Sequence, residues 1–431
     1  MLIFYFVYLY IYKNYFVILI IYNINLFLMD PNNIFLLIFK EFYPHIIVLI
    51  LLIFNYISLL HIILFYILFC LYYRISSKSI LIYTPSDINQ NILNKCPNIT
   101  SLNFKPSFFF PSNHLQLILS LFIKVSNKKY KVISKKQTIG NTGVELDWIK
   151  YEGINTDNFP ILLIIPGLTG GIKDPYVMNL VDLGIKNNFN VVIYQMRLLS
   201  ENITFPHDGT HVDVAIDLDK AIDEIRQQYG NDIKIYGIGY SYGANQLVNY
   251  LGRLNCKKKK IDAGVSISNP YDFLVCAKFS ENTIYDRLLL YFLKKLYKKI
   301  QPAVERDKEY NIKGDRILST NNVHDFDDFL TSKMMGYDSH TDYYRHIGSG
   351  QFLRNVNVPL LCIHSEDDKI TSFKGVPIDD ILNNNNIILL KTSYGSHTMF
   401  YEDGEGFFNY RQWCIKPAVE FLNVIKNVNK Y

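Results

Sequence analysis

The segment Gly239-Tyr240-Ser241-Tyr242-Gly243 determines the fold that we expect for this chain. Apolar, β-prone residues at 233–238 come before it and predict a short buried strand, and residues 244–251 after it have the pattern of a helix. A serine on the sharp turn between a strand and a helix stands clear of the sheet with its hydroxyl exposed. The flanking glycines leave room where a Cβ would collide with a neighbouring strand or helix. The segment therefore predicts a nucleophile elbow with Ser241 as the nucleophile.

Short apolar strands and helical segments alternate on both sides of this turn. Such alternation predicts an α/β fold in which a mostly parallel sheet is covered by helices on both faces. Between residues 269 and 358 the alternation stops, and residues 284–300 have a basic amphipathic helical pattern. We therefore expect a helical cap insertion at about 270–357. The expected strands cover 161–165, 191–194, 263–267, 360–363 and 387–390, and the expected helices cover about 176–187 and 211–228.

Two further side chains complete a candidate catalytic triad. Acyl transfer by serine needs a base that takes the hydroxyl proton and an acid that orients the base, and on this fold the chain order is serine, acid, histidine. Asp368 follows the strand at 360–363, and His397 follows the strand at 387–390. Each lies just past the carboxyl end of a strand, where open α/β sheets place their sites. The sequence therefore predicts Ser241, Asp368 and His397 as the catalytic residues.

Other residues near the expected acid compete for the same role. Glu366 and Asp367 directly precede Asp368. We favour Asp368 because the two earlier acidic residues could simply face water. His364 lies inside or at the end of its strand, and we interpret it as structural.

Backbone groups are expected to bind the oxyanion that forms during acyl transfer, which needs two N–H donors aimed at the developing charge. One donor should be Tyr242, which directly follows the nucleophile. The other should come from the loop Pro166-Gly167-Leu168-Thr169-Gly170-Gly171, which follows the buried strand at 161–165. Within this loop we favour Leu168, next to Gly167.

The beginning of the chain predicts a membrane anchor. Residues 46–72 are almost unbroken apolar, and the run exceeds the ~20 residues that a helix needs to cross a bilayer. Residues 1–28 are also apolar but are interrupted by Lys13 and several asparagines, so a second span, a re-entrant segment and an interfacial tail are all open. We expect one or two transmembrane helices at 1–75, a linker with an amphipathic region at 76–130 and a hydrolase domain at 131–431. The expected location is a membrane, with an endomembrane such as the endoplasmic reticulum as the first choice.

Composition limits the classes of partner and cofactor. The net charge of +5 is too small to indicate nucleic-acid binding. The six cysteines lie far apart without metal-ligand spacing, and no HExxH, P-loop or GxGxxG motif is present. We therefore expect no metal and no cofactor.

Several short motifs occur together in a fixed order, and on them the chain from about Cys96 to its end resembles the AB hydrolase-4 family of membrane-anchored α/β-hydrolases. That family includes bacterial esterase-like proteins, yeast enzymes that form and cleave medium-chain esters, and animal phospholipases acting on medium-chain phosphatidylcholine. The resemblance implies triad roles for Ser241, Asp368 and His397, and one N-terminal anchor. The motifs are Pro166–Gly171 with Pro175-Tyr176, Gly239–Asn245, Ser268–Asp272, Phe326-Asp327 with Thr331, Gly336-Tyr337, Asp342–Arg345, Pro359–Ile363 with Asp367-Asp368, and Gly395–His397.

The departures of the chain from the family pattern lie outside the triad. Arg197 is followed by Leu198 where the family has glycine, and Lys369 replaces a common proline after the acidic pair. These changes bear on substrate preference more than on catalysis.

Three functions follow as hypotheses. The leading one is a membrane-bound serine hydrolase that cleaves acyl esters, with lipid or small medium-chain esters as substrates. The first alternative keeps the acyl-enzyme but transfers the acyl group to an alcohol, although no histidine has the aspartate of an HxxxxD acyltransferase motif after it. The second alternative is a non-catalytic, membrane-tethered binding protein, which the presence of all three triad residue types disfavours.

Overall fold

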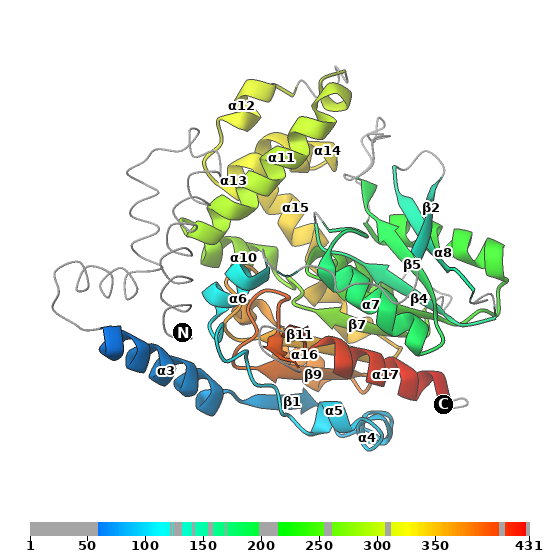
Figure 1. Ribbon diagram of the computed structural model, residues 1–431. Helices are drawn as coiled ribbons and strands as arrows, with labels where there is room; N and C mark the ends of the chain where they lie inside the picture. The colour runs from blue at the N-terminus through cyan, green and yellow to red at the C-terminus, as the bar shows by residue number, and fades with distance from the viewer. Residues whose placement is uncertain are drawn as a thin grey trace.

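The computed structural model describes residues 59–120, 123, 132–139, 143–153, 158–168, 170–197, 214–253, 261–306, 312–404 and 410–427 (Figure 1). The possible span at 1–28, and the part of the expected span at 46–72 that precedes Leu59, lie outside these residues. Within the described part of the chain, one large sheet carries nine strands in the order β1-β9-β8-β7-β6-β4-β5-β3-β2.

The middle of this sheet is parallel, which confirms the predicted α/β class. The flanking strands β1 (Ser79–Tyr83), β2 (Val132–Thr138) and β3 (Glu145–Tyr151) pair antiparallel with their neighbours. The elbow strand runs two residues later than expected, from 235 instead of 233. The parallel strands are β4 (Ile161–Ile165), β5 (Asn190–Gln195), β6 (Ile235–Tyr240), β7 (Ala263–Ile267), β8 (Leu360–Ser365) and β9 (Ile387–Thr392).

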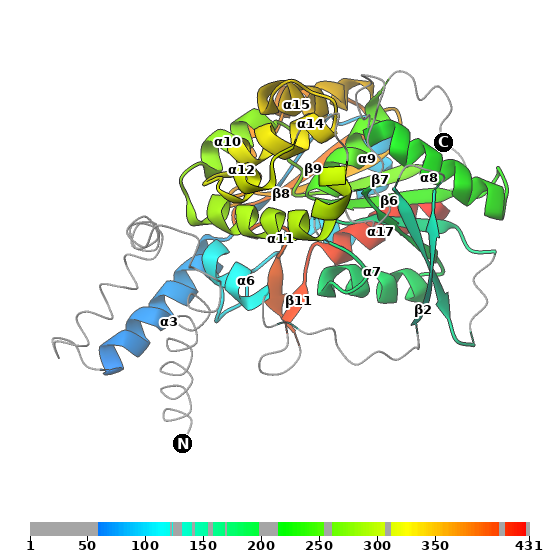
Figure 2. The same ribbon diagram turned by 90° about the horizontal axis from the view of Figure 1, so that it is seen from above.

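Helices cover both faces because alternate residues of the central strands point to opposite sides. Leu162 and Ile164 of β4 share a core cluster with residues of α7 and α17. Leu163 and Ile165 share a second cluster with residues of α8 and α9. Figure 2 shows α8 and α9 on one side of the sheet and α7 on the other. These helices are α7 (Pro175–Lys186), α8 (Val214–Tyr229), α9 (Tyr242–Gly252) and α17 (Ile415–Asn427).

Part of the expected linker at 76–130 belongs to the same body. β1 pairs with β9, with Ser79 opposite Thr392, so this stretch supplies an edge strand of the sheet. The short helices α4 (Asp87–Leu93) and α5 (Pro97–Thr100) follow it. Buried side chains around these helices, such as Ile92 and Ile99, join the core cluster that contains α7 and α17.

Helix α3 (Leu59–Ser76) contains the described part of the expected membrane span and projects beside the body (Figures 1 and 2). One side of it is buried, since Cys70 is fully covered, and the other side is apolar and exposed, with Leu60 72% and Ile75 78% accessible. Within the described residues, no helix combines the length and the apolar character that crossing a bilayer requires.

The regular structure described between β7 and β8 is helical, and most of it lies in the upper half of Figure 1. Leu290, Tyr297, Phe326 and Leu330 contribute to a small core of its own. Its elements are α10 (Phe273–Ser280), α11 (Ile284–Arg306), α12 (Gly314–Leu318), α13 (Val323–Phe326), η3 (Asp327–Thr331), α14 (Ser332–Met334), α15 (His340–Ile347) and η4 (Ser349–Asn355). The remaining elements are α6 (Asn113–Ser120), η5 (Phe373–Gly375), α16 (Ile378–Leu382), β10 (Tyr401–Asp403) and β11 (Tyr410–Gln412).

Candidate active site

Ser241 occupies the turn between the last residue of β6 and the first residue of α9. Its backbone has φ 51° and ψ −122°, a conformation that a non-glycine residue adopts only at a cost of about 1–3 kcal/mol. Two backbone hydrogen bonds hold it there: the Ser241 N–H donates to Ile267 O at 2.8 Å, and Ser241 O accepts from the Asn245 N–H at 3.1 Å. The side chain is therefore presented by a strained turn at the carboxyl edge of the sheet.

The glycines beside this turn are needed for space. A Cβ on Gly239 would lie 2.6 Å from Ala244 Cα and 2.6 Å from Gly243 O, both of which are backbone atoms of α9. A Cβ on Gly243 would overlap the carbonyl oxygens of Ile165 and Pro166. The sequence pattern thus lets α9 start directly against β6 and the loop after β4.

His397 joins Ser241 to Asp368. Its Nε2 lies 2.9 Å from Ser241 Oγ, and its Nδ1 lies 2.9 Å from Asp368 Oδ2. A carboxylate can only accept, so Nδ1 carries the hydrogen and Nε2 is left to accept from the serine hydroxyl. The three side chains that the sequence singled out are therefore in contact, in the order serine, histidine, aspartate.

Asp368 is held as an ionised carboxylate. Its Oδ1 accepts from the N–H groups of Ile370 and Thr371, both at 2.8 Å, and its Oδ2 accepts from the Thr371 hydroxyl at 2.7 Å. Burial on its own would raise the pKa of Asp368, but the His397 ring and the Thr371 hydroxyl outweigh burial and hold this pKa below its usual range. The site thus keeps a negative charge on the far side of the imidazole.

Leu168 and Tyr242, the expected oxyanion donors, belong to two segments that lie beside Ser241. The loop with Leu168 approaches the nucleophile, because a Cβ on Gly167 would stand 3.4 Å from Ser241 Cβ. Gly167 is itself fixed by its N–H, which donates to the Tyr176 hydroxyl at 3.1 Å. Tyr242 is the first residue of α9, where backbone N–H groups have no partner inside the helix.

The acidic residues before Asp368 differ from each other. Glu366 is exposed and pairs with Lys391, as expected for a residue that faces water. For Asp367 that expectation is wrong. The residue is partly exposed as a whole, but its Oδ2 has no solvent contact and its Oδ1 accepts from the Ser396 N–H at 2.9 Å. The tight turn after β8 directs this side chain inward, toward the loop that carries His397.

His364 and Thr371 support the loop that carries the acid. His364 lies in β8, is buried, and contacts Thr371 O through Nε2 at 2.8 Å, in agreement with its structural interpretation. Burial lowers the pKa of His364, so the ring is neutral. The sequence analysis missed Thr371. The signal was its position three residues after Asp368, because an aspartate often accepts from the backbone two or three residues later.

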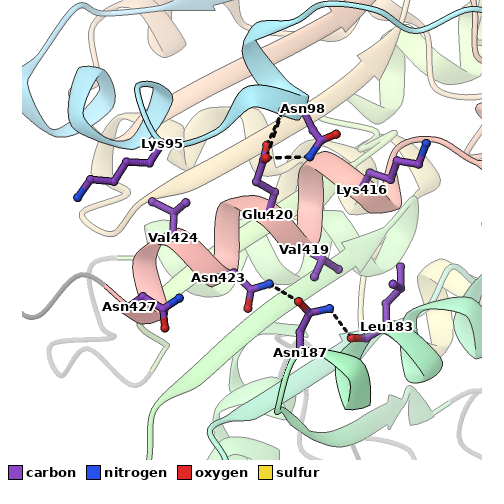
Figure 3. Close-up of a pocket in the computed structure, with 10 residues that line it drawn as sticks. All are labelled: Lys95, Asn98, Leu183, Asn187, Lys416, Val419, Glu420, Asn423, Val424 and Asn427. Atoms are coloured by element: carbon purple, nitrogen blue, oxygen red, sulfur yellow. Dashed lines mark hydrogen bonds between the residues drawn. The ribbon is translucent and has the colours of Figure 1, made fainter.

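A pocket of about 540 Å³ lies apart from these residues (Figure 3). It opens between α17, α5 and α7, and Lys95, Asn187 and Asn423 are among the residues that line it. None of the triad residues lines it. Within the described part of the chain, no group of His, Cys, Asp or Glu side chains is arranged to hold a metal ion.

Comparison with known families agrees with the fold. Residues 160–402, more than half of the chain, match the family model of the alpha/beta hydrolase fold. The chain therefore belongs to the α/β-hydrolase family.

Relatives of similar length carry the identification further. An abhydrolase domain-containing protein of Dictyostelium discoideum is 30% identical over 80% of this chain and 87% of its own length. The monoacylglycerol lipase of Saccharomyces cerevisiae is 29% identical over 63% and 61%, and the human phospholipase ABHD3 is 25% identical over 78% and 83%. These relatives confirm the predicted branch of the family, and the protein is a carboxylic ester hydrolase.

Proposed function

We propose that the protein is a serine hydrolase that cleaves lipid or medium-chain acyl esters at Ser241. His397 acts as the base and Asp368 as the acid that orients it. The observation that carries the proposal is the continuous line of hydrogen bonds from Ser241 Oγ through the His397 ring to Asp368 Oδ2. A serine hydroxyl is a weak nucleophile until an adjacent base removes its proton, and this line supplies that base.

The positions of these atoms support the following acylation step. Ser241 Oγ attacks the ester carbonyl carbon as its proton passes to His397 Nε2, and Asp368 stabilises the imidazolium that forms. The negative charge that develops on the carbonyl oxygen is bound by the N–H groups of Leu168 and Tyr242. The tetrahedral intermediate then collapses, the bond to the alcohol breaks, and the departing oxygen takes the proton from His397 Nε2. The acyl group remains on Ser241.

Deacylation repeats these steps with water. His397 Nε2 takes a proton from the water as its oxygen attacks the acyl carbon. The same two N–H groups bind the second oxyanion. Its collapse releases the carboxylic acid, and the proton returns to Ser241 Oγ.

Two observations support lipid esters as the substrate class. The relatives include proteins named monoacylglycerol lipase and phospholipase. Helix α3 also exposes a row of apolar side chains, including Leu64, Phe65 and Leu68. We propose that this face, with the expected anchor before it, holds the enzyme at a membrane, because anchoring raises the local concentration of substrates that partition into lipid.

Labelling with a fluorophosphonate probe tests the proposal. The full-length protein in detergent is expected to react covalently, and the Ser241→Ala variant is expected not to react while keeping the same thermal unfolding midpoint. Glu366→Gln is the matched control, since Glu366 faces solvent and pairs with Lys391. A folded wild-type protein that stays unlabelled, or a Ser241→Ala variant that labels equally, refutes the assignment.

Product analysis then separates hydrolysis from acyl transfer. A p-nitrophenyl ester of medium chain length releases p-nitrophenol, and with water as acceptor the free acid is its only acyl product. Added ethanol or lysolipid gives a new ester if the acyl-enzyme prefers alcohols. Predominance of the new ester at low alcohol concentration would replace hydrolysis by acyl transfer as the function.

A further inference from the structure

The loop that carries His397 needs to be held in place, because its backbone is strained. Gly395 has φ 153°, and Ser396 and Thr398 have φ values of 57° and 63°. Left-handed backbone at residues other than glycine persists only where surrounding contacts impose it. The position of the imidazole therefore depends on what the neighbouring backbone is bonded to.

Ser396, directly before His397, is bonded at each of its polar groups. Its O accepts from the Ser365 hydroxyl at 2.8 Å, and its own hydroxyl donates to Asn113 O at 2.9 Å. Its N–H donates to Asp367 Oδ1 at 2.9 Å. Asp367 is the ionisable member of these three partners, so in its ionised form it is the one that can make the strongest hydrogen bond.

Resting on the proposed function of the triad, we propose that Asp367 is a positioning residue. Its carboxylate holds the Ser396 N–H and thereby fixes the backbone from which the His397 ring reaches Ser241. The two adjacent aspartates then have different roles in positioning His397. Asp368 binds the ring at Nδ1, and Asp367 binds the main chain one residue earlier.

The surroundings of Asp367 make this contact sensitive to pH. The pKa of its carboxyl is raised to about 7, chiefly by burial; the charge of Asp368 also raises it, whereas the Ser396 N–H and the Ser365 hydroxyl lower it. Lys369 on the same loop lowers this pKa, and burial and, in turn, the charge of Asp367 raise the pKa of Tyr394 on the histidine loop and of Tyr73 on α3. An ionised carboxylate accepts more strongly than a neutral one, so the contact with Ser396 strengthens as pH rises through about 7.

The burial and the main-chain contact of Asp367 also support a positioning role. Asp367 Oδ2 has no solvent contact and no hydrogen-bond partner within the described residues. The Asn113 side chain meanwhile donates to Asp367 O at 3.2 Å, which fixes the main chain of the acid loop beside the histidine loop. A carboxyl with a buried oxygen is not an ordinary solvent-facing surface charge. Its Oδ1 instead accepts a hydrogen bond from the backbone of the loop that carries His397.

Two substitutions of Asp367 test the proposal, with Glu366→Gln as the neighbouring control. Asp367→Ala removes the acceptor. We expect kcat for a soluble p-nitrophenyl ester to fall by about tenfold to a hundredfold, the scale of a charge-assisted hydrogen bond, with KM changed by no more than about threefold. Asp367→Asn keeps a neutral acceptor, and we expect a smaller fall in kcat.

The pH–rate profile supplies a readout that a purely structural role would not change. In the wild type, protonation of Asp367 on acidification should add an ionisation to the acid limb of kcat/KM, which should then be steeper than a single ionisation. In Asp367→Asn it should follow a single ionisation. The pH–rate profile of Asp367→Asn therefore tests the positioning role even if Asp367→Ala fails to fold.

The outcomes separate this inference from the proposed function. A wild type that reacts with the fluorophosphonate, together with a folded Asp367→Ala variant whose kcat is within about twofold of Glu366→Gln, overturns the role of Asp367 alone. An Asp367→Asn profile that superimposes on that of the wild type does the same. A wild type that does not react with the probe refutes the proposed function itself.

Discussion

Gly239→Ala tests whether the close approach of β6 and α9 places the reactive groups. The added Cβ would stand 2.6 Å from Ala244 Cα. Carbon atoms in good contact lie about 3.5–4.0 Å apart, so the first turn of α9 must move away by about 1 Å. The three atoms nearest to this Cβ are all backbone, so rotation of a side chain cannot relieve the overlap with them.

This movement should be visible in both stability and activity. Overpacking of this kind lowers the free energy of unfolding by about 1–3 kcal/mol. The first turn of α9 also carries the Tyr242 N–H, and a displacement of about 1 Å at a reacting geometry can reduce the rate by about a hundredfold. We therefore expect Gly239→Ala to unfold at lower urea concentration and to react with the fluorophosphonate about a hundred times more slowly.

Gly237→Ala in the same strand is the matched control. Its Cβ would meet Leu247 Cδ1 at 2.8 Å, the end of a flexible side chain that can rotate. We expect a loss below about 1 kcal/mol and labelling within a few fold of the wild type. If the two variants have the same unfolding free energy and the same labelling rate, the reasoning about backbone contact at the elbow is refuted.

Three further substitutions probe the acid, a buried ion pair and the helical insertion. Asp368→Asn should lower kcat by on the order of a thousandfold or more, because the amide cannot stabilise the imidazolium; ester hydrolysis at pH 8 measures this, and a loss below tenfold would contradict it. Asp217 is 5% exposed and bonded to Arg197 at 2.6 Å, and Arg197→Met would leave its carboxylate without this partner. Urea denaturation should show that the free energy of unfolding falls by about 3 kcal/mol, and an unchanged midpoint would count against the prediction. Burial raises the pKa of Asp327 to about 6, so the stability that this carboxyl contributes is complete below a pH of about 4 and is lost as pH rises through about 6. A plot of the thermal unfolding midpoint against pH should therefore fall less steeply in this range for Asp327→Asn than for the wild type, and an equal slope would refute the prediction.

The central strands could be predicted because each is short, apolar and fully buried. β4 and β7 have the bounds that the apolar runs gave, since a parallel strand covered on both faces has no polar side to blur its limits. The site residues followed from the same signal. Ser241, Asp368 and His397 each stand just after such a strand, and the carboxyl ends of parallel strands meet at one edge of the sheet.

Contacts between distant parts of the chain could not be predicted in this way. Ser79–Tyr83 looked like part of a linker, and its pairing with β9 joins residues about three hundred positions apart, which no local pattern encodes. Asp367 and Asp368 are identical in type and adjacent. Which of them contacts the ring and which contacts the main chain is decided by the turn after β8, and a run of acidic residues does not show that turn.

The match to the family model begins at residue 160, yet the histidine loop is held partly by residues before it. The ring of Tyr73 on α3 lies 4.6 Å from the ring of Tyr394, and the hydroxyls of Ser76 and Tyr394 are 2.9 Å apart. On the other side of His397, the Tyr401 N–H donates to the Gln116 side chain at 3.0 Å. Helix α3 is therefore packed against the hydrolase body, and the body cannot rotate independently of it. It cannot shift along its axis without breaking contacts to the loop that carries His397, and a surface that binds the exposed face of α3 would set the orientation of the reactive edge as well as its distance from that surface.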